Sequence, residues 1–369
     1  MHVPFCVSKC RYCDFNSHEG FGRDTAGYVN ALAWEIERRA PAPARTIFLG
    51  GGTPTYLDAE SLRTILAALA RAGALERHDL EFTVEANPES ATEEKLQILR
   101  AGGANRLSLG VQSFDEAQLR RFDRAHSVAD VRRAVAAARA SGFVNFNLDL
   151  IFAKEGETLE SWRRELDEAL ALEPQHLSCY ELTFEPATAL ARDLERGRAR
   201  KAEESLRSEL FHFTIEYLAS SGFQQYEVSA FARPGRECRH NLVYWTSGSW
   251  IGVGAGATTA LGACRATDFA LPETYARAIR ETGSSLDPST IECSTPKDRF
   301  FEVLMMGLRL RTGIPAELIV RRSGEDPLRQ PSGPLWALID QGLLELRDGW
   351  LAATPRGFEV LDSVLGQLL

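Results

Sequence analysis

Residues 45–55 read RTIFLGGGTPT, an apolar stretch that ends in three glycines and precedes an amphipathic pattern at residues 59–71. A short apolar run bounded by Gly and Pro predicts a strand, and apolar residues three and four apart predict a helix. The same order recurs up to about residue 185. We predict strands at residues 1–5, 45–49, 80–85, 106–110, 144–151 and 176–183, and helices at residues 26–39, 59–71, 93–100, 128–140 and 159–172.

This alternation of strands and helices determines the expected fold class. Strands that alternate with helices form parallel sheets with right-handed crossovers. Six such units are too few to close an eight-stranded barrel. The sequence therefore predicts an α/β fold, a partial (β/α)6 TIM-type barrel with parallel strands, over residues 1–185. Ligands of such folds bind at the carboxyl ends of the strands.

The rest of the chain divides into two further predicted units. Residues 186–290 form an extension of the barrel, in which 190–220 is a charged helical stretch and 226–263, rich in Gly, Ser and aromatic residues, reads as strands and loops. A polar linker near 283–296 leads into a C-terminal α+β domain at 291–369. Its predicted order resembles a winged helix: helices at 299–309, 315–321 and 334–341, a two-stranded wing at 343–353 and a last helix at 356–368.

Composition restricts the function classes. The chain has 369 residues and a net charge of −9, without a Lys/Arg-rich run, which argues against a nucleic-acid partner. No apolar run approaches the ~18 residues of a membrane span, and the N-terminus lacks the pattern of a signal peptide. A cytoplasmic location is the expectation, and peripheral contact with a membrane is left open.

Three of the seven cysteines cluster at the N-terminus, as Cys6-x3-Cys10-x2-Cys13. The odd number and the missing export signal argue against a disulfide framework, so Cys179, Cys264 and Cys293 are expected to be small core residues. Closely spaced thiolates suit iron–sulfur clusters and zinc. Three of them bind three irons of a cubane and leave the fourth iron open. A structural zinc with His2 or His18 as fourth ligand is the alternative, although zinc sites usually show a second cysteine or histidine pair.

The sequence around these cysteines resembles a known family. FCVSKCRYC, residues 5–13, resembles the radical S-adenosylmethionine (SAM) signature. The longer segment HVPFCVSKCRYCDFNSH is similar to the oxygen-independent coproporphyrinogen III oxidase family, and most similar to its heme-chaperone branch. The resemblance extends over nearly the whole chain. It implies a [4Fe-4S] cluster on Cys6, Cys10 and Cys13, with SAM as a second cofactor and Tyr12 near its adenine.

The resemblance also implies which residues bind SAM. They lie at or after the predicted strand ends, Arg124 at a family offset from Gln112. Each residue type also has a purely structural explanation, such as a tight turn, a helix cap, a surface amide, a solvated arginine or an internal ion pair. The family uses them for the amino group (Gly51, Gly52 and Thr53), for SAM contact (Glu85), for the ribose (Gln112 and Asp149) and for the methionyl carboxylate (Arg124).

Three departures from the family pattern stand out. In the family, a tyrosine usually precedes the His-x-Pro-Phe-Cys segment, and the sequence has no counterpart before Met1. Our hypothesis is that the true start site lies further upstream. Asp123 stands where many relatives have Gly. Residues 152–156, FAKEG, replace a segment that commonly ends in Gly-Leu-Pro-Gly, so no adenine contact is assigned there.

Two function classes compete within this resemblance. A heme chaperone is favoured because Phe15 replaces the fourth cysteine of the oxidases, because their longer N-terminal extension is missing, and because residues 240–245, HNLVYW, match the HNxxYW motif of the chaperone branch. A neutral imidazole is a common heme ligand, and flat aromatic rings suit a porphyrin face. The candidate heme-binding residues are His240, Asn241, Tyr244, Trp245 and Cys238.

The runner-up function is oxidative decarboxylation of coproporphyrinogen III, and whether the protein is an enzyme stays open. An unrelated radical SAM enzyme that acts on RNA is disfavoured by the acidic composition. The chaperone interpretation implies heme, heme-acceptor proteins, among them respiratory proteins, and an electron donor as partners. It leaves a homodimer open.

Overall fold

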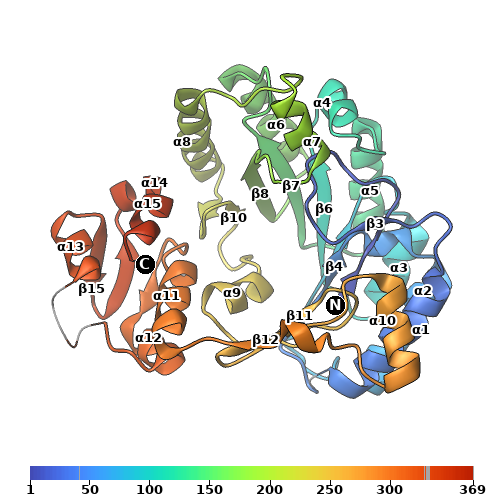
Figure 1. The fold of residues 1–369 in the computed structure, drawn as a ribbon. Helices are drawn as coiled ribbons and strands as arrows, with labels where there is room; N and C mark the ends of the chain where they lie inside the picture. The colour runs from blue at the N-terminus through green and yellow to red at the C-terminus, as the bar shows by residue number, and fades with distance from the viewer. Residues whose placement is uncertain (41, 328, 330–332, 369) are drawn as a thin grey trace.

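The computed structural model describes residues 1–40, 42–327, 329 and 333–368. Six parallel strands form one sheet in the order β1-β4-β5-β6-β7-β8, and helices cover its outer face (Figure 1). The predicted α/β fold with a partial parallel barrel is therefore confirmed. These strands are β1 His2–Val3, β4 Thr46–Gly51, β5 Glu81–Ala86, β6 Arg106–Gln112, β7 Phe146–Phe152 and β8 His176–Glu181.

Two short strands extend this sheet beyond β8. The strand β10 (Ala230–Ala232) pairs antiparallel with β8, and β9 (Gln224–Gln225) pairs antiparallel with β10. The sequence did not assign these residues to the barrel sheet. Because they continue it on the side away from β1, the barrel stays open between β9 and β1.

The crossover helices begin at capped positions that the sequence signals. Asp, Thr or Ser precedes each one, and its side chain accepts a hydrogen bond from the backbone of the first turn. In α2 the apolar residues Leu62, Ile65, Leu66 and Leu69 face the sheet and are buried. These helices are α1 Thr25–Arg39, α2 Ala59–Arg71, α3 Glu93–Ala101, α5 Val128–Ala140 and α6 Leu159–Ala171, with the short α4 Glu116–Arg121 and η1 Pro54–Tyr56 in the loops.

The two faces of the strands differ in chemistry. In β6, Leu107 and Leu109 point outward into the core beneath the helices. Ser108 lies between them and points inward, where its hydroxyl donates to Asp149 and accepts from Asn147. Alternation along a strand thus separates an apolar outer layer from a polar barrel interior.

The first predicted strand is two strands in the structure. β1 ends at Val3, and after Pro4 the chain forms β2 (Phe5–Cys6), which pairs with β3 (His18–Glu19). This second pairing closes the loop that carries the three clustered cysteines.

The region after the barrel differs most from expectation. The charged stretch at residues 190–220 is two helices, α7 (Ala189–Glu195) and α8 (Glu204–Ser220), and α10 (Pro272–Thr282) was not predicted. Residues 226–263 were expected to hold only strands and loops, and this is wrong, because they include helix α9 (Arg239–Trp245) besides the strand β11 (Thr258–Leu261). The backbone N–H groups of Arg239 and His240, at the start of α9, donate to the carboxylate of Glu81 on β5. A distant residue therefore caps this helix, and no local sequence signal reports it.

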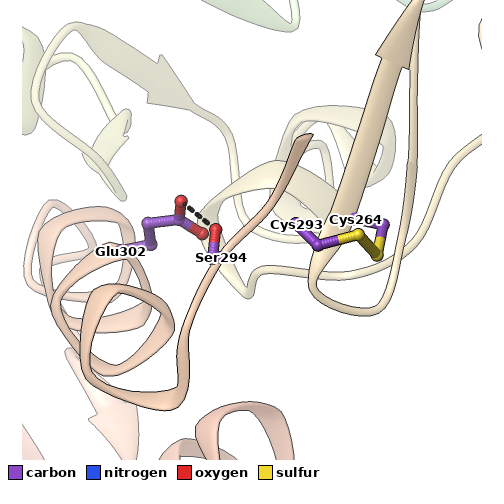
Figure 2. The surroundings of a disulfide bond; sticks show 4 residues. All are labelled: Cys264, Cys293, Ser294 and Glu302. Atoms are coloured by element: carbon purple, nitrogen blue, oxygen red, sulfur yellow. Dashed lines mark hydrogen bonds between the residues drawn. A yellow bond between two sulfur atoms is a disulfide. The ribbon is translucent and has the colours of Figure 1, made fainter. Parts of the chain in front are cut away.

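Cys264 and Cys293 correct another expectation. They are exposed rather than in the core, and they are joined by a disulfide (Figure 2). The physical reason is the antiparallel pairing of β12 (Cys264–Thr267) with β13 (Glu292–Cys293), which places the two residues opposite each other across 29 positions of sequence. The third cysteine, Cys179, is buried in the core as predicted.

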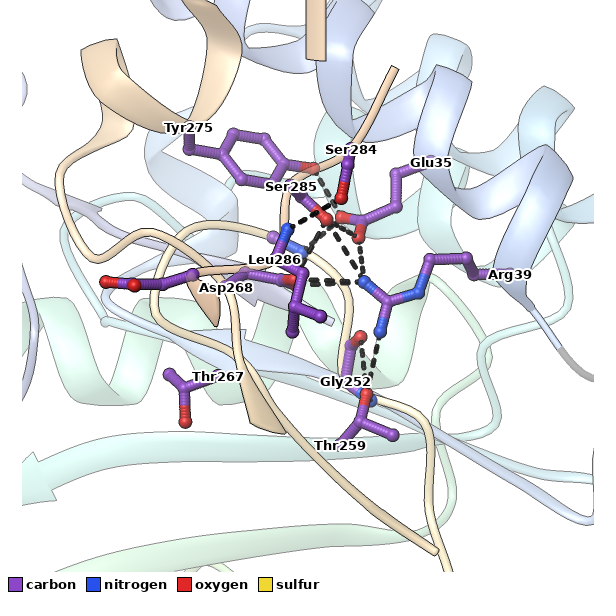
Figure 3. Close-up of polar contacts among 12 residues, drawn as sticks. Glu35, Arg39, Gly252, Thr259, Thr267, Asp268, Tyr275, Ser284, Ser285 and Leu286 are labelled. Atoms are coloured by element: carbon purple, nitrogen blue, oxygen red, sulfur yellow. Dashed lines mark hydrogen bonds and ion pairs between the residues drawn. The ribbon is translucent and has the colours of Figure 1, made fainter. Parts of the chain in front are cut away.

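A buried polar cluster connects the extension, residues 186–290, to helix α1 of the barrel (Figure 3). Glu35 and Arg39 of α1 form an ion pair. Arg39 also bonds Asp268 at 3.0 Å, and Ser285 donates to both carboxylates. The Glu35 carboxylate further accepts from the hydroxyl of Tyr275 on α10 at 2.5 Å. Burial and the neighbouring Glu35 raise the pKa of Asp268 to about 7.

The C-terminal part has its own apolar core, formed by residues such as Val303, Ile319 and Leu351. The predicted winged-helix-like order is present, except that the last helix breaks at Val360. The elements are α11 Pro296–Gly307, β14 Ile314–Pro315, α12 Ala316–Ser323, α13 Pro334–Asp340, β15 Leu344–Arg347, β16 Trp350–Ala353, α14 Pro355–Glu359 and α15 Leu361–Gly366. The short η2 (Pro288–Thr290) belongs to the extension, where Thr290 bonds Thr267 of β12. Across the described part of the chain, no helix has the length and apolar character needed to cross a membrane.

Candidate functional site

The three clustered cysteines lie over the carboxyl edge of the sheet. The Thr53 hydroxyl, just after β4, donates to the sulfur of Cys6 at 3.3 Å. The guanidinium of Arg124, from the segment after β6, donates to the sulfur of Cys10 at 3.3 Å. All three thiols are half-buried, and burial raises the pKa of Cys6 and Cys13. Nearby donors and a cation are the surroundings that compensate thiolate ligands.

A chain of hydrogen bonds connects these two contacts. Asn87 donates to the Thr53 hydroxyl at 2.8 Å and accepts from Arg124 at 2.7 Å. Arg124 also donates to the carbonyl of Gly110 at 2.6 Å. Sequence reasoning singled out Glu85 in the segment EANPE and missed Asn87, two residues further on in the same segment. The structure shows Arg124 already engaged in three hydrogen bonds.

Glu85 and the glycine triplet lie together. The backbone N–H of Gly51 donates to a carboxylate oxygen of Glu85 at 3.0 Å. A Cβ at Gly50 would come within 2.4 Å of that carboxylate, and one at Gly52 within 2.8 Å of the Phe5 backbone nitrogen. The glycines are therefore needed for close packing inside the protein itself. Burial raises the pKa of Glu85 to about 7.

The remaining SAM candidates line the same end of the barrel. Gln112 ends β6 with a positive φ of 69° and is half-buried. Asp149 accepts from Asn147 at 2.8 Å, and burial raises its pKa. The expectation that Asp149 ends its strand is wrong, because β7 continues to Phe152. The Tyr12 ring packs edge-on against Phe122, with 5.1 Å between the centroids.

The heme candidates lie elsewhere, at the opposite edge of the sheet. His240 of α9 bonds the Thr46 hydroxyl, at the start of β4, at 2.8 Å and the Tyr244 hydroxyl at 2.9 Å. Its ring stacks on Phe48. Burial lowers the pKa of His240 to about 3, so the imidazole is neutral. The structure therefore does not bring His240 and the cysteine loop together.

The other α9 candidates differ in accessibility. Asn241, Tyr244 and Trp245 are half-buried, and the indole N–H of Trp245 has no acceptor among the described residues. Cys238 is fully buried, and its sulfur lies 3.7 Å from a Glu81 oxygen. A thiol in that position is not accessible to a porphyrin in this conformation.

Comparison with known proteins adds the family. Residues 1–169 match the model of the Radical SAM superfamily, and residues 294–360 match that of the HemN C-terminal domain. "Heme chaperone HemW" of Bacillus subtilis is 33% identical over 376 residues, with 100% of this chain and 99% of that protein aligned. The protein of the same name from Escherichia coli is 35% identical over 99% of this chain and 96% of its own length. The chain belongs to the HemW family of radical SAM proteins. The resemblance read from its sequence is thereby confirmed.

One solved structure supports the fold of this HemW family member. The coproporphyrinogen III oxidase HemN of Escherichia coli, described as a radical SAM enzyme, superposes with a TM-score of 0.83. The match covers 100% of this chain and 88% of that one, at 24% sequence identity. At that identity the likeness establishes the shared architecture alone.

Membership of the radical SAM family implies a [4Fe-4S] cluster and SAM, and the residues present fit them. The donors are three thiols on one short loop, each within hydrogen-bond reach of a hydroxyl or a guanidinium. Within the described residues, no three His, Cys, Asp or Glu side chains gather closely enough to hold a single metal ion.

Proposed function

We propose that this protein is a heme chaperone that binds a [4Fe-4S] cluster, SAM and heme and delivers heme to acceptor proteins. The observation that carries the proposal is the full-length similarity to several proteins named heme chaperone HemW, together with the HNxxYW motif on α9. The separation of α9 from the cysteine loop supports two distinct sites.

Cys6, Cys10 and Cys13 would hold the cluster. When bound, such a cluster offers one iron without a protein ligand to the amino and carboxylate groups of SAM and supplies an electron to the sulfonium. Thr53 and Arg124 donate to two of the sulfurs and thereby stabilise their thiolate forms.

SAM would lie beside the cluster along the carboxyl edge of the sheet. Gly51, Gly52 and Thr53 would face its amino group, and Glu85 would lie close to them because Gly51 donates to its carboxylate. Residues proposed for the rest of the cofactor are Gln112 and Asp149 at the ribose, Arg124 at the carboxylate and Tyr12 near the adenine.

Heme would bind at α9, where the half-buried rings of Tyr244 and Trp245 offer flat apolar area. His240 is the proposed iron ligand. Since both of its ring nitrogens are hydrogen-bonded, ligation through Nε2 requires the bond to Tyr244 to open. Further predictions are the acceptor proteins, an electron donor, a homodimer and a cytoplasmic location with contact to a membrane.

Anaerobic reconstitution with iron and sulfide tests the cluster assignment. We expect a brown chromophore near roughly 400 nm, typical of a cubane held by cysteines. Cys10→Ala should abolish it, whereas a Cys264→Ala/Cys293→Ala double variant should retain it. Full cluster loading in Cys10→Ala, or zinc without sulfide in the wild type, would contradict the assignment.

A second experiment separates the chaperone from the oxidase. The reduced, cluster-loaded protein is incubated with SAM and coproporphyrinogen III, and separate samples are titrated with hemin. The chaperone function predicts stoichiometric hemin binding and no consumption of the porphyrinogen. Protoporphyrinogen produced over many turnovers would establish the oxidase instead.

A further inference from the structure

Arg106 occupies an unusual place in the barrel. It is the first residue of β6 and only 2% exposed. Strand alternation puts it on the same face as Ser108, whose contacts with Asn147 and Asp149 mark that face as the barrel interior. The guanidinium is therefore directed into the barrel rather than toward the surrounding helices.

Within the described part of the chain, this guanidinium makes no side-chain hydrogen bond and no close ion pair, and its buried Nε has no acceptor. The carboxyl groups of Glu85 and Asp149 interact with its charge only at longer range. Thr83 is paired directly opposite on β5, is fully buried, and its hydroxyl likewise has no partner. Burying a charge or a hydroxyl without compensation destabilises a fold, so two such groups side by side indicate a ligand.

The acidic groups nearby are already engaged with other donors. Glu81 accepts from the backbone of Arg239 and His240, at 3.0 and 2.9 Å. Glu85 accepts from Gly51, and Asp149 accepts from Ser108 and Asn147. Glu85 and Asp149 feel the charge of Arg106 but form no close ion pair with it, so its guanidinium N–H groups stay available to a ligand.

Other groups near this position are neutral donors and acceptors. His176 bonds Asn147 at 2.7 Å and the Tyr226 hydroxyl at 2.9 Å through its two ring nitrogens. Burial, with the charge of Arg106, holds the pKa of His176 far below its usual range. The surroundings of Arg106 thus present neutral hydrogen-bonding groups. The nearby N-terminal ammonium of Met1 is engaged with the Phe48 carbonyl, and burial lowers its pKa to about 6.

The position along the barrel suggests what the ligand is. Glu81, Thr83 and Glu85 alternate on one face of β5, with α9 bound at the first and the glycine triplet at the last. Thr83 and Arg106 therefore lie between the proposed heme and SAM sites. The interior is accessible at the carboxyl end of the sheet, where Tyr180 of β8 is 45% exposed.

We propose that Arg106 and Thr83 form a carboxylate-binding site inside the barrel, which takes a propionate side chain of the tetrapyrrole. A guanidinium pairs with a carboxylate in a two-pronged fork, and the threonine hydroxyl supplies a third donor. The inference rests on the proposed function, because the tetrapyrrole is the carboxylate-bearing ligand expected at α9.

The first test uses the wild-type protein alone. Hemin and hemin dimethyl ester have the same macrocycle and iron, but only hemin has free carboxylates. We expect hemin to bind about tenfold to a hundredfold more tightly, the range of a buried charge-assisted bond. Equal affinities would overturn the carboxylate site while leaving the chaperone function standing. No binding of either compound would overturn both.

Two variants localise the effect. Arg106→Gln should remove the preference for hemin over its ester, and Thr83→Val, of nearly the same shape, should reduce it without lowering the unfolding midpoint, since its hydroxyl has no partner to lose. The surface variant Arg139→Gln is the matched control and should keep the full preference. A preference that persists in Thr83→Val and Arg106→Gln would overturn the proposal.

A third measurement distinguishes the two carboxylates that the proposed ligands contain. The affinity of Thr83→Val and Arg106→Gln for SAM is measured by equilibrium dialysis against the wild type. We expect no change, because the methionyl carboxylate is proposed to lie near Arg124. A tenfold loss of SAM affinity with unchanged hemin affinity would assign Arg106 to SAM and overturn the propionate site.

Discussion

Asp123 shows how a single residue sets the geometry next to the proposed cluster site. Its φ of 54° lies in the left-handed region, which favours Gly and which Asp adopts at a small energetic cost. This conformation accounts for the Gly that the family resemblance leads us to expect at this position. The Asp123 carbonyl accepts a hydrogen bond from Ser8, and its carboxylate bonds Arg11. These contacts hold the cysteine loop next to Arg124.

A substitution at Asp123 therefore acts through the backbone. Asp123→Val should lower the free energy of unfolding by about 1–2 kcal/mol, because a branched side chain is strained in the left-handed region. Asp123→Gly should stay within about 1 kcal/mol of the wild type, since it loses only an exposed ion pair. Denaturant unfolding of both variants measures the difference, and equal losses would show that the ion pair, not the backbone, matters.

At the scale of elements, the barrel strands and crossover helices were predictable because their signals are local. A strand bounded by Gly and a helix with an Asp or Thr cap carry the evidence within a few residues. Helix α9 was missed because its cap, Glu81, comes from a strand more than 150 residues earlier. The pairing of Cys264 with Cys293 was missed for the same reason.

The candidate site divides in the same way. The cysteines, the glycine triplet and Glu85 belong to short motifs and were found from sequence. Arg106 was missed because its isolation depends on which residues β5, β6 and β7 bring to the barrel interior. Asn87 was missed because its role is to connect Thr53 with Arg124, and only the fold places these two near each other.

The loop between β7 and α6 departs in sequence from the family pattern, and it contains the buried Lys154. The Lys154 side chain is 1% exposed, and its ammonium contacts Glu157 at 2.5 Å and Glu165 at 3.2 Å. Glu165 in turn accepts from Ser113 and from the backbone of Phe114, directly after Gln112. Lys154 thus connects this loop to the segment that carries a proposed SAM ligand.

Removing this charge should be costly. Lys154→Met leaves two buried carboxylates without a cation and should lower the free energy of unfolding by about 3–5 kcal/mol. The exposed pair of Arg164 with Glu160 offers a control, where Arg164→Gln should cost at most about 0.5 kcal/mol. Denaturation curves give both values. A loss in Lys154→Met no larger than in the control would contradict the role of the buried ion pair.

At the scale of the whole molecule, two sets of polar contacts connect the extension to the barrel. Glu81 binds the start of α9 at the edge opposite the cysteine loop. The cluster of Glu35, Arg39, Asp268 and Ser285 binds the extension to α1 (Figure 3). The same region supports the first strand, because the Tyr28 hydroxyl donates to the His2 carbonyl and accepts from Ala255. Loosening this cluster would therefore affect the strand that leads into Cys6.

The polar cluster around Asp268 should make the stability of the protein depend on pH. Asp268 has a pKa of about 7 in the folded protein, against a usual value of 3.8. As pH rises from about 4 to 7, the unfolded chain releases this proton while the folded protein keeps it, so the contribution of Asp268 to stability falls and then levels off above pH 7. In Asp268→Asn the amide oxygen still accepts from Arg39 and Ser285 but does not titrate. We therefore expect the unfolding midpoint of the variant, relative to that of the wild type, to rise from pH 5 to about pH 7 and to stay constant from there to pH 8. A constant difference across that range would mean that Asp268 is already ionised in the folded protein at pH 5.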